Sequence, residues 1–293
     1  MRRLVAVLLV TASLLSLPPS AGAAERIPAT GQVYVLDSAQ LPAEPGPVVV
    51  RGRLETADAN NRVLVELRVQ CDSGQSIWTT QNMGKGQQRA VLNARATLEA
   101  DSQCELQVRA LVPGFAGAKP DVSFAVTSAR LTATRGGHAS TRQSSNTLLP
   151  QGGALDALEL SWTAPEDVRQ FTVTADTQLT NCYGPARECT RESVNTDDSV
   201  VDTRLIVSQR ARDGGYCAVT RWPARGMDRI EVTWTEHHQK NYHRVPVQVS
   251  DDASCTRTFV VKVHMRHVRG NEVLVEGNVP RGSGWYSTAF VHV

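Results

Sequence analysis

The chain has 293 residues, with 31 lysines and arginines against 29 aspartates and glutamates, so its formal net charge is only +2. A protein this close to neutrality has no electrostatic reason to bind nucleic acid or an anionic membrane surface, and neither partner is expected. The length exceeds that of one ordinary β-sandwich and suits two.

Residues 1–23 predict a secretory signal peptide. Arg2 and Arg3 precede an apolar run that ends at Leu17, and a small-residue pattern ends at Ala23, where cleavage is expected. The apolar run is too short to remain as a membrane-spanning helix. Loss of the two arginines leaves equal numbers of acidic and basic residues. We therefore expect a secreted or periplasmic protein without a transmembrane segment in its mature chain.

Short segments of alternating apolar and polar residues dominate the rest of the chain, for example PVVVRGR, RVLVELRV, FTVTAD and FVVKVHM. Turn-rich pieces such as ADANN and RARDGG separate them. This pattern is typical of antiparallel strands, so we expect an all-β fold. One segment, QQRAVLNARATLEAD at 87–101, could form a helix in place of a strand, because it is rich in helix formers. Its counterpart in an internal repeat has strand character, and we predict a strand there.

The internal repeat relates two stretches that share an order of turn, strand, turn, strand and cysteine. The first begins LPAEPGPVVV and ends at Cys71, and the second begins LPQGGALDAL and ends at Cys182. Cys104 and Cys217 follow them at similar distances. Repetition over this length indicates tandem domains.

The repeat places two antiparallel β-sandwiches at 24–130 and 151–293. Residues 131–150 are rich in Ser, Thr, Gly and Gln and are expected to form a linker or long loop. The C-terminal part, about 50 residues, is too short for a third sandwich of about 100. We expect it to form a β-hairpin extension packed on the second sandwich.

The segment LELSWTAPEDVRQFTVTA at 158–175 resembles the second and third strands of fibronectin type III and related immunoglobulin-like domains. In those domains a tryptophan packs in the core, a proline follows it, and an aromatic residue opens the next strand. The matching positions here are Trp162, Pro165 and Phe171. The resemblance implies immunoglobulin-like sandwiches, although the cysteine spacing departs from that family. It implies no function, because this fold serves many different roles.

Six cysteines in an exported chain predict three disulfides. If the repeat is correct, equivalent cysteines in the two domains form equivalent bonds, and the two cysteines left over pair with each other. The alternative is a local bond from Cys182 to Cys189, which leaves Cys217 to pair with Cys255. The bonds expected from the repeat are Cys71–Cys104, Cys182–Cys217 and Cys189–Cys255.

The stretch TEHHQKNYHR at 235–244 contains three of the seven histidines. If it turns a hairpin, Glu236 and His238 share a face and His243 returns toward them on the second strand. Two imidazoles and one carboxylate are the ligands that zinc or non-haem iron requires. The polar tip of an exposed hairpin has the same composition, and no HExxH spacing is present. No cofactor and no catalytic residue is therefore assigned.

Aromatic residues beside glycines or in loops are candidates for binding a sugar ring. Trp285 and Tyr286 in PRGSGWYSTAF, together with Trp78 in SIWTTQN, are the best placed. The alternative is that these rings complete a sandwich core, as aromatic residues often do. Trp162 and Trp234 are expected in the core.

These features favour an exported, non-enzymatic module that binds a protein or a glycan at the cell envelope or outside the cell. A purely structural role in the envelope is a second possibility. The alternative from another class is a metal-dependent hydrolase that uses Glu236, His238 and His243.

Overall fold

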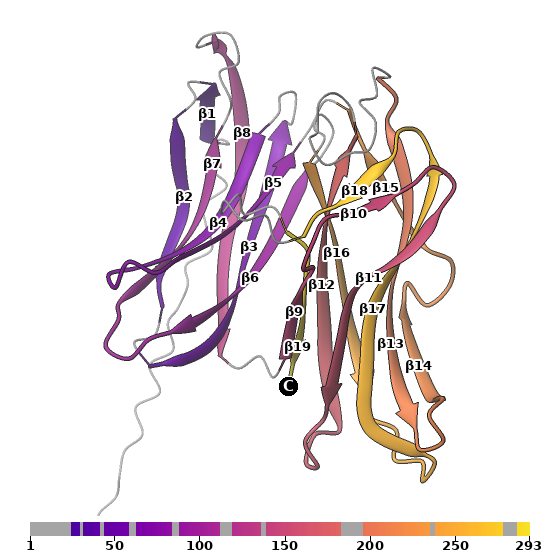
Figure 1. Ribbon diagram of the computed structural model, residues 1–293. Helices are drawn as coiled ribbons and strands as arrows, with labels where there is room; N and C mark the ends of the chain where they lie inside the picture. Colours follow the sequence, from indigo (N-terminus) through magenta and orange to yellow (C-terminus); the bar gives the residue numbers. More distant parts are fainter. Residues whose placement is uncertain are drawn as a thin grey trace, which may run out of the picture.

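The computed structural model describes residues 25–29, 32–41, 44–58, 63–83, 88–111, 119–135, 139–182, 196–234, 238–277 and 286–293. These ranges contain strands and turns but no helix, so the predicted all-β class is confirmed. None of the described residues belongs to a helix long and apolar enough to cross a membrane. Four antiparallel sheets form two sandwich-like domains that lie side by side (Figure 1). The expected signal peptide lies outside the described residues.

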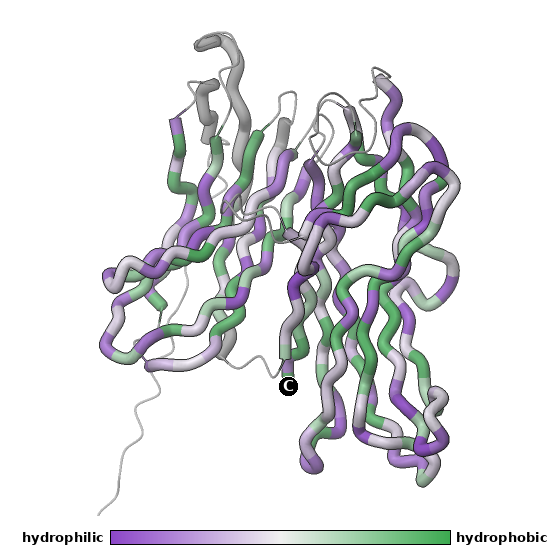
Figure 2. The backbone as a smooth tube through the Cα atoms, viewed as in Figure 1, coloured by the Kyte–Doolittle hydropathy of each residue, from purple (hydrophilic) through white to green (hydrophobic). Residues whose placement is uncertain are grey.

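The first domain is a sandwich of two four-stranded sheets, ordered β1-β8-β3-β6 and β2-β7-β4-β5. Hydrophobic and hydrophilic residues alternate along many of the strands (Figure 2). The buried hydrophobic residues of both sheets form one core. In β4, for example, Val63, Val65, Leu67 and Val69 are buried and their neighbours are not. The strands are β1 (Glu25–Ala29), β2 (Val33–Gln40), β3 (Gly46–Asp58), β4 (Val63–Cys71), β5 (Ser76–Met83), β6 (Arg89–Leu98), β7 (Cys104–Leu111) and β8 (Lys119–Arg135).

The second domain has one sheet built on β12 and another built on β13. Strand β12 pairs with β16 along one edge and with β18 and β19 along the other, and β10 and β9 extend that side. The facing sheet has the order β11-β17-β13-β14, with β15 also paired to β13. The strands are β9 (Ala139–Arg142), β10 (Thr147–Leu149), β11 (Ala154–Thr163), β12 (Gln170–Asn181), β13 (Ser199–Ala211), β14 (Tyr216–Trp222), β15 (Asp228–Val232), β16 (His238–Gln248), β17 (Cys255–Arg269), β18 (Val273–Val275) and β19 (Thr288–His292).

The strands have the same order in the sheets of both domains. Strands β9-β19-β12-β16 repeat the order β1-β8-β3-β6, and β11-β17-β13-β14 repeat β2-β7-β4-β5. Along the chain, successive strands of this common set alternate between the two sheets, except that the fourth and fifth share one sheet. This is the arrangement of an eight-stranded jelly roll built from two Greek keys. In an immunoglobulin-like sandwich the first two strands share a sheet. The two expected tandem sandwiches are therefore present, but the immunoglobulin-like strand order is wrong.

Each domain has its own apolar core. The core residues of the first domain come from positions up to Leu131, and those of the second begin at Ala139. In the second core, Trp162 packs edge-on against Phe171, with ring centroids 4.7 Å apart. The core positions implied for these two rings are therefore correct, whereas Trp234 is only half-buried.

The stretch 131–150, expected as a linker or long loop, contains the end of β8 and the whole of β9 and β10. Strand β9 pairs with β19 and so already belongs to the second domain. The C-terminal residues are also part of that sheet, because β19 lies between β12 and β9. They are an integral strand of the jelly roll and not an appended hairpin.

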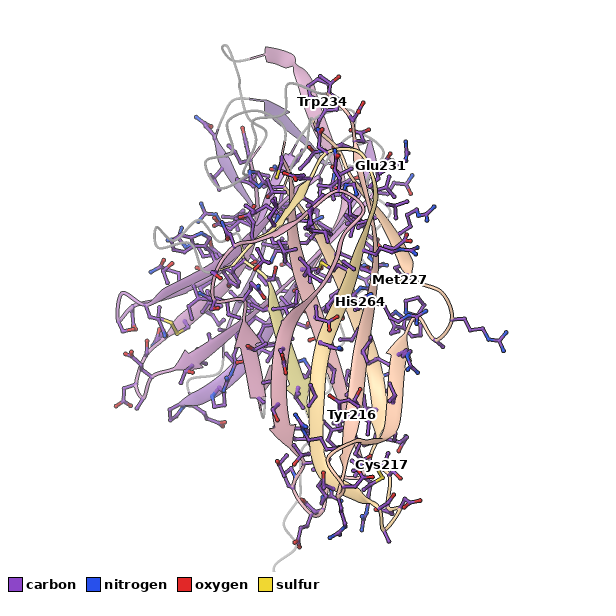
Figure 3. All side chains as sticks on the ribbon, turned by 45° about the vertical axis from the view of Figure 1, so that its right-hand side comes forward. Tyr216, Cys217, Met227, Glu231, Trp234 and His264 are labelled. Carbon is purple, nitrogen blue, oxygen red and sulfur yellow. A yellow bond between two sulfur atoms is a disulfide. The ribbon has the colours of Figure 1, made fainter. Side chains whose placement is uncertain are left out.

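Two disulfides are defined by the described residues. Cys71 and Cys104 are bonded as expected, at positions opposite each other on β4 and β7. Cys217 is bonded to Cys255, beside Tyr216 at the lower end of the second domain (Figure 3). The expected bonds Cys182–Cys217 and Cys189–Cys255 are therefore wrong. Cys182 is disulfide-bonded as well, and Cys189 lies outside the described residues.

The error in the pairing comes from the repeat alignment, which is displaced by one strand. Cys71 ends β4, whose equivalent in the second domain is β13, but Cys182 follows β12. The residue opposite Cys255 is Ala211, at the end of β13, just as Cys71 is opposite Cys104. Cys255 is thus the true equivalent of Cys104, and it bonds to β14 because β13 offers it no cysteine.

Candidate functional site

The outer face of the β12 sheet is covered by the first domain. On β12, Val173 and Ala175 point into the second core, whereas Thr174 and Asp176 point outward. These outward side chains are nevertheless buried, and Asp176 is only 1% exposed. Strands β5 and β6 of the first domain pack against β16 at this face. The two sandwiches therefore share an interface made largely of polar side chains.

Hydrogen bonds join the two domains at this interface. Asn93 on β6 donates from Nδ2 to Asp176 Oδ2 at 2.9 Å. The ammonium group of Lys240, on β16, donates to the hydroxyl of Thr79 on β5. Nearby, the Arg95 guanidinium donates to Ser140 Oγ at 2.7 Å. Buried polar groups are tolerated when they are paired in this way.

Asp176 and Lys240 form the charged centre of the interface. Burial raises the pKa of Asp176 to about 6, although the charge of Lys240, the hydrogen bond from Asn93 and the charge of Arg51 oppose the shift. Burial likewise lowers the pKa of Lys240 to about 8, against the attraction of Asp176. Each charge is costly to bury and is stabilised by the other.

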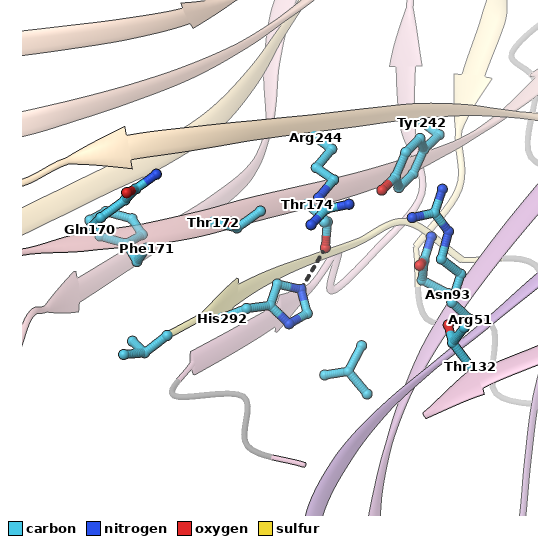
Figure 4. Close-up of a pocket in the computed structure, with 12 residues that line it drawn as sticks. Arg51, Asn93, Thr132, Gln170, Phe171, Thr172, Thr174, Tyr242, Arg244 and His292 are labelled. Carbon is cyan, nitrogen blue, oxygen red and sulfur yellow. Dashed lines mark hydrogen bonds between the residues drawn. The ribbon is translucent and has the colours of Figure 1, made fainter. Parts of the chain in front are cut away.

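Beside this contact the two domains leave an open cleft of about 540 Å³ (Figure 4). One wall comes from β3, β6 and β8 of the first domain, and the other from β12, β16 and β19 of the second. Nine of the twelve lining residues carry hydrogen-bonding side chains. The lining residues are Val49, Arg51, Asn93, Thr132, Gln170, Phe171, Thr172, Thr174, Tyr242, Arg244, His292 and Val293.

The charge of the cleft is set by two arginines on opposite walls. Arg51 projects from β3 over the ring of Tyr242, 4.8 Å from its centroid. Arg244 projects from β16 and is exposed. No carboxylate lines the cleft, and neither guanidinium forms an ion pair with an acidic side chain in the described ranges. The cleft therefore presents two cations whose charge no lining residue neutralises.

Two further titratable side chains line the cleft. Burial raises the pKa of Tyr242, while the nearby arginines 51, 244 and 89 oppose that shift. Burial, reinforced by the charge of Arg244, lowers the pKa of His292. The His292 ring is held by Thr174, whose Oγ1 lies 3.0 Å from Nε2. At neutral pH the imidazole is uncharged and the phenol is protonated, so both serve as neutral hydrogen-bonding groups.

The structure does not bring together the imidazoles expected to share a metal. His238 and His243 lie on one strand, β16, five positions apart, so their side chains point to opposite faces of the sheet. The hairpin expected between them does not form. His238 bonds to Glu276, with Nδ1 2.9 Å from Oε1. Glu236 lies outside the described residues, and no group of three metal-binding side chains occurs among those described.

His243 lies in the second sandwich with none of its side chain exposed. Its Nε2 is 3.0 Å from Thr203 Oγ1 and 3.1 Å from Asn241 Nδ2. Burial lowers its pKa to about 4, although Asp228, 3.4 Å away, favours the charged form. This residue is a neutral interior histidine and not a solvent-accessible ligand.

Two of the three aromatic candidates meet at the domain interface. The hydroxyl of Tyr286 donates to the carbonyl oxygen of Trp78 at 3.1 Å. Tyr286 is only 7% exposed, and the Arg142 guanidinium lies 3.8 Å from its ring centroid. Trp78 is half-buried on β5, with Arg68 stacked at 5.6 Å. Tyr286 is thus an interface residue and not an open sugar platform, and Trp285 lies outside the described residues.

Sequence reasoning missed the residues that line the cleft. Tyr242 stands within the histidine-rich stretch, but its importance depends on Arg51, which lies far away in the sequence. No local signal in the sequence could have identified this pair, because Arg51 and Tyr242 become neighbours only when the two domains pack together. Outside the cleft, the side chain of Trp222 on the edge strand β14 is 46% exposed.

No protein-family model and no curated protein matches the sequence. Among solved structures, the CBM22 tandem domain of Xyn10C from Paenibacillus barcinonensis aligns with 90% of this chain and 84% of its own, at 8% identity and a TM-score of 0.24. A calcium-binding mutant of Bacteroides uniformis beta-glucuronidase 2 aligns with 81% of this chain and 25% of its own, at 13% identity and a TM-score of 0.23. A protein from Parabacteroides distasonis aligns with 93% and 87%, at 10% identity and a TM-score of 0.22. Likenesses at TM-scores this low carry no conclusion about this chain.

Proposed function

We propose that the chain is an exported glycan-binding protein whose ligand lies in the cleft between the two jelly rolls. One observation carries the proposal: a cleft of about 540 Å³ is lined by both domains and offers side-chain hydroxyl, amide, imidazole and guanidinium groups. A sugar chain presents many hydroxyl groups, and such a lining can donate to them and accept from them. The volume falls within the range of small-molecule sites.

Several lining groups are free to bind. The side chains of Gln170 and Thr172 form no hydrogen bond with another described residue, and both project from the β12 sheet into the cleft. The strands that hold them are fixed by long antiparallel pairing, since β12 pairs with β16 over eleven consecutive positions. A rigid wall of this kind binds without the cost of ordering loops.

Binding is favoured over hydrolysis by the lining of the cleft. Glycoside hydrolysis uses a pair of carboxyl groups at the scissile bond, and no described carboxylate lines this site. Export is supported by the disulfides Cys71–Cys104 and Cys217–Cys255, since such bonds persist in oxidising compartments. The signal peptide predicted at 1–23 belongs to the same proposal.

Native gel electrophoresis in the presence of individual polysaccharides tests this function. The wild-type protein should be retarded by at least one of them. Thr172→Trp should abolish the retardation because the indole fills the cleft, whereas the matched change Ser161→Trp on the exposed edge strand β11 should not. Trp222→Ala should also leave binding intact. Unretarded migration in every polysaccharide, or loss of binding only in Trp222→Ala, would reject the cleft as a glycan site.

A further inference from the structure

The proposed function does not specify the type of sugar, but the charge of the cleft indicates a class. Arg51 and Arg244 approach the site from different domains, and the lining contains no acidic group. A guanidinium that points into a partly enclosed site without an anion is poorly compensated until a ligand supplies one. We propose, on the basis of that function, that the cleft selects an acidic glycan and places a carboxylate or sulfate group of the sugar between these two arginines.

The two arginines differ in how firmly they are held. Arg51 is fixed by its stacking on Tyr242, with the guanidinium 4.8 Å from the ring centroid. Stacking leaves the N–H groups at the edge of the guanidinium plane available for a carboxylate or a sulfate. Arg244 is exposed, has no hydrogen-bonding partner among the described residues, and stands two positions after Tyr242 on the same face of β16. Arg51 thus provides a preorganised donor, and Arg244 would contact the anion from the opposite wall.

The neighbouring side chains suit the remainder of an acidic sugar. His292 is held against Thr174 and is neutral, so it adds no competing positive charge and offers a hydrogen bond. Thr172 and Gln170 lie along the same wall and suit ring hydroxyls. Figure 4 shows Arg244, Thr174 and His292 on one side of the cleft and Arg51 on the other. The cleft therefore combines two arginines that can bind an anion with neutral side chains that can bind hydroxyl groups.

Asp176 is the acidic side chain that acts on the cleft from behind its lining. It is buried in the domain interface, where it accepts a hydrogen bond from Asn93 and attracts both Lys240 and Arg51. None of the ion pairs between described residues joins Asp176 to Arg51 or Arg244. The cleft therefore presents the charge of Arg244 together with that of Arg51, which Asp176 offsets only in part.

Isothermal titration calorimetry with matched ligands tests the inference, at about 150 mM salt so that diffuse attraction is screened. One pair of probes is an oligogalacturonate and its fully methyl-esterified form, and the other is dextran sulfate and dextran. At least one acidic member should bind about tenfold or more tightly than its neutral partner. The pair that shows the preference identifies carboxylate or sulfate as the recognised group.

Arg51→Gln and Arg244→Gln should each remove that preference, because glutamine keeps polarity and loses the charge. Arg221→Gln is the matched control, since Arg221 is an exposed arginine on β14, outside the cleft lining. It should bind as the wild type does. Circular dichroism of each variant establishes that it is folded, and Arg244→Gln, at an exposed position, keeps the test valid if Arg51→Gln fails to fold.

Three outcomes separate this inference from the function on which it rests. Equal affinity for acidic and neutral members would overturn the acidic preference and leave glycan binding in place. An equal loss in Arg221→Gln would also overturn it, since the preference would then reflect diffuse charge. Failure to bind any glycan, acidic or neutral, would overturn both.

Discussion

At the scale of single residues, His243 shows how position on a strand decides chemistry. Its imidazole lies inside the second sandwich, where burial lowers its pKa to about 4. The folded state therefore binds fewer protons at this site than the unfolded state, in which the pKa is about 6.5. This site's contribution to stability is fully present above pH 6.5 and is lost as the pH falls toward 4.

NMR titration checks this directly. The ring resonances of His243 should stay at their neutral positions as the pH is lowered from about 7 to about 5, and the same ring should titrate near 6.5 in the urea-unfolded protein. A midpoint above about 6 in the folded protein would show that the ring is accessible to water and would restore it as a candidate ligand.

If the turn before β16 had been placed correctly, the alternation of side chains along a strand would have predicted the two histidines on opposite faces. His238 and His243 were expected on different strands of a hairpin, but β16 already begins at His238. One strand then fixes them on opposite faces. Turn position depends on the long pairing of β12 with β16, which no local pattern reveals.

At the scale of strands and bonds, Cys217–Cys255 ties the start of β14 to the start of β17. The two cysteines are 38 positions apart, and closing a loop of that length stabilises the fold by about 4 kcal/mol in the chain-entropy model. The double change Cys217→Ser and Cys255→Ser should lower the free energy of unfolding by about this amount in urea denaturation. An unchanged midpoint would show that the bond constrains nothing in the unfolded chain.

Individual strands were predictable, but their order was not. The stretch 87–101 is rich in helix formers, yet β6 forms there with buried Ala90, Leu92, Ala94 and Ala96 in strand alternation. Alternation is a local property of the sequence. The jelly-roll order depends on pairing between distant strands such as β1 and β8, and this is also why the cysteine alignment slipped by one strand.

At the scale of the whole molecule, the ionisation of Asp176 in the domain interface makes the free energy of unfolding depend on pH. Its raised pKa of about 6 means that the folded state holds its proton more tightly than the unfolded state does. Ionisation of Asp176 therefore lowers the free energy of unfolding as the pH rises from about 4, and this loss is complete above about 6. Relative to Asp176→Asn, the wild type should lose about 2 kcal/mol of unfolding free energy between about pH 4 and about pH 6.5.

Urea denaturation of the two proteins across that range measures the difference. Asp213→Asn is the matched control, because it also removes a carboxyl group but at an exposed position, in the turn before β14. Curves for wild type and Asp176→Asn that stay parallel over the whole range would contradict the burial of this carboxyl group.

The position of the cleft could not be predicted from the sequence for the same reason that the strand order could not. Arg51 belongs to β3 of one domain, and Tyr242 and Arg244 belong to β16 of the other. Each is an ordinary outward residue of its own strand, and only the docking of the two sandwiches makes them neighbours. Two tandem sandwiches were predictable, but the site that they form together was not.

A crystal structure of the protein with a bound acidic oligosaccharide would show where the ligand lies. We expect electron density for a sugar between β3 and β12, with its carboxylate or sulfate within hydrogen-bonding distance of Arg51 and Arg244. Density for the sugar at the exposed Trp222 on β14, with the cleft between the two domains filled only by solvent, would show that the cleft is not the binding site.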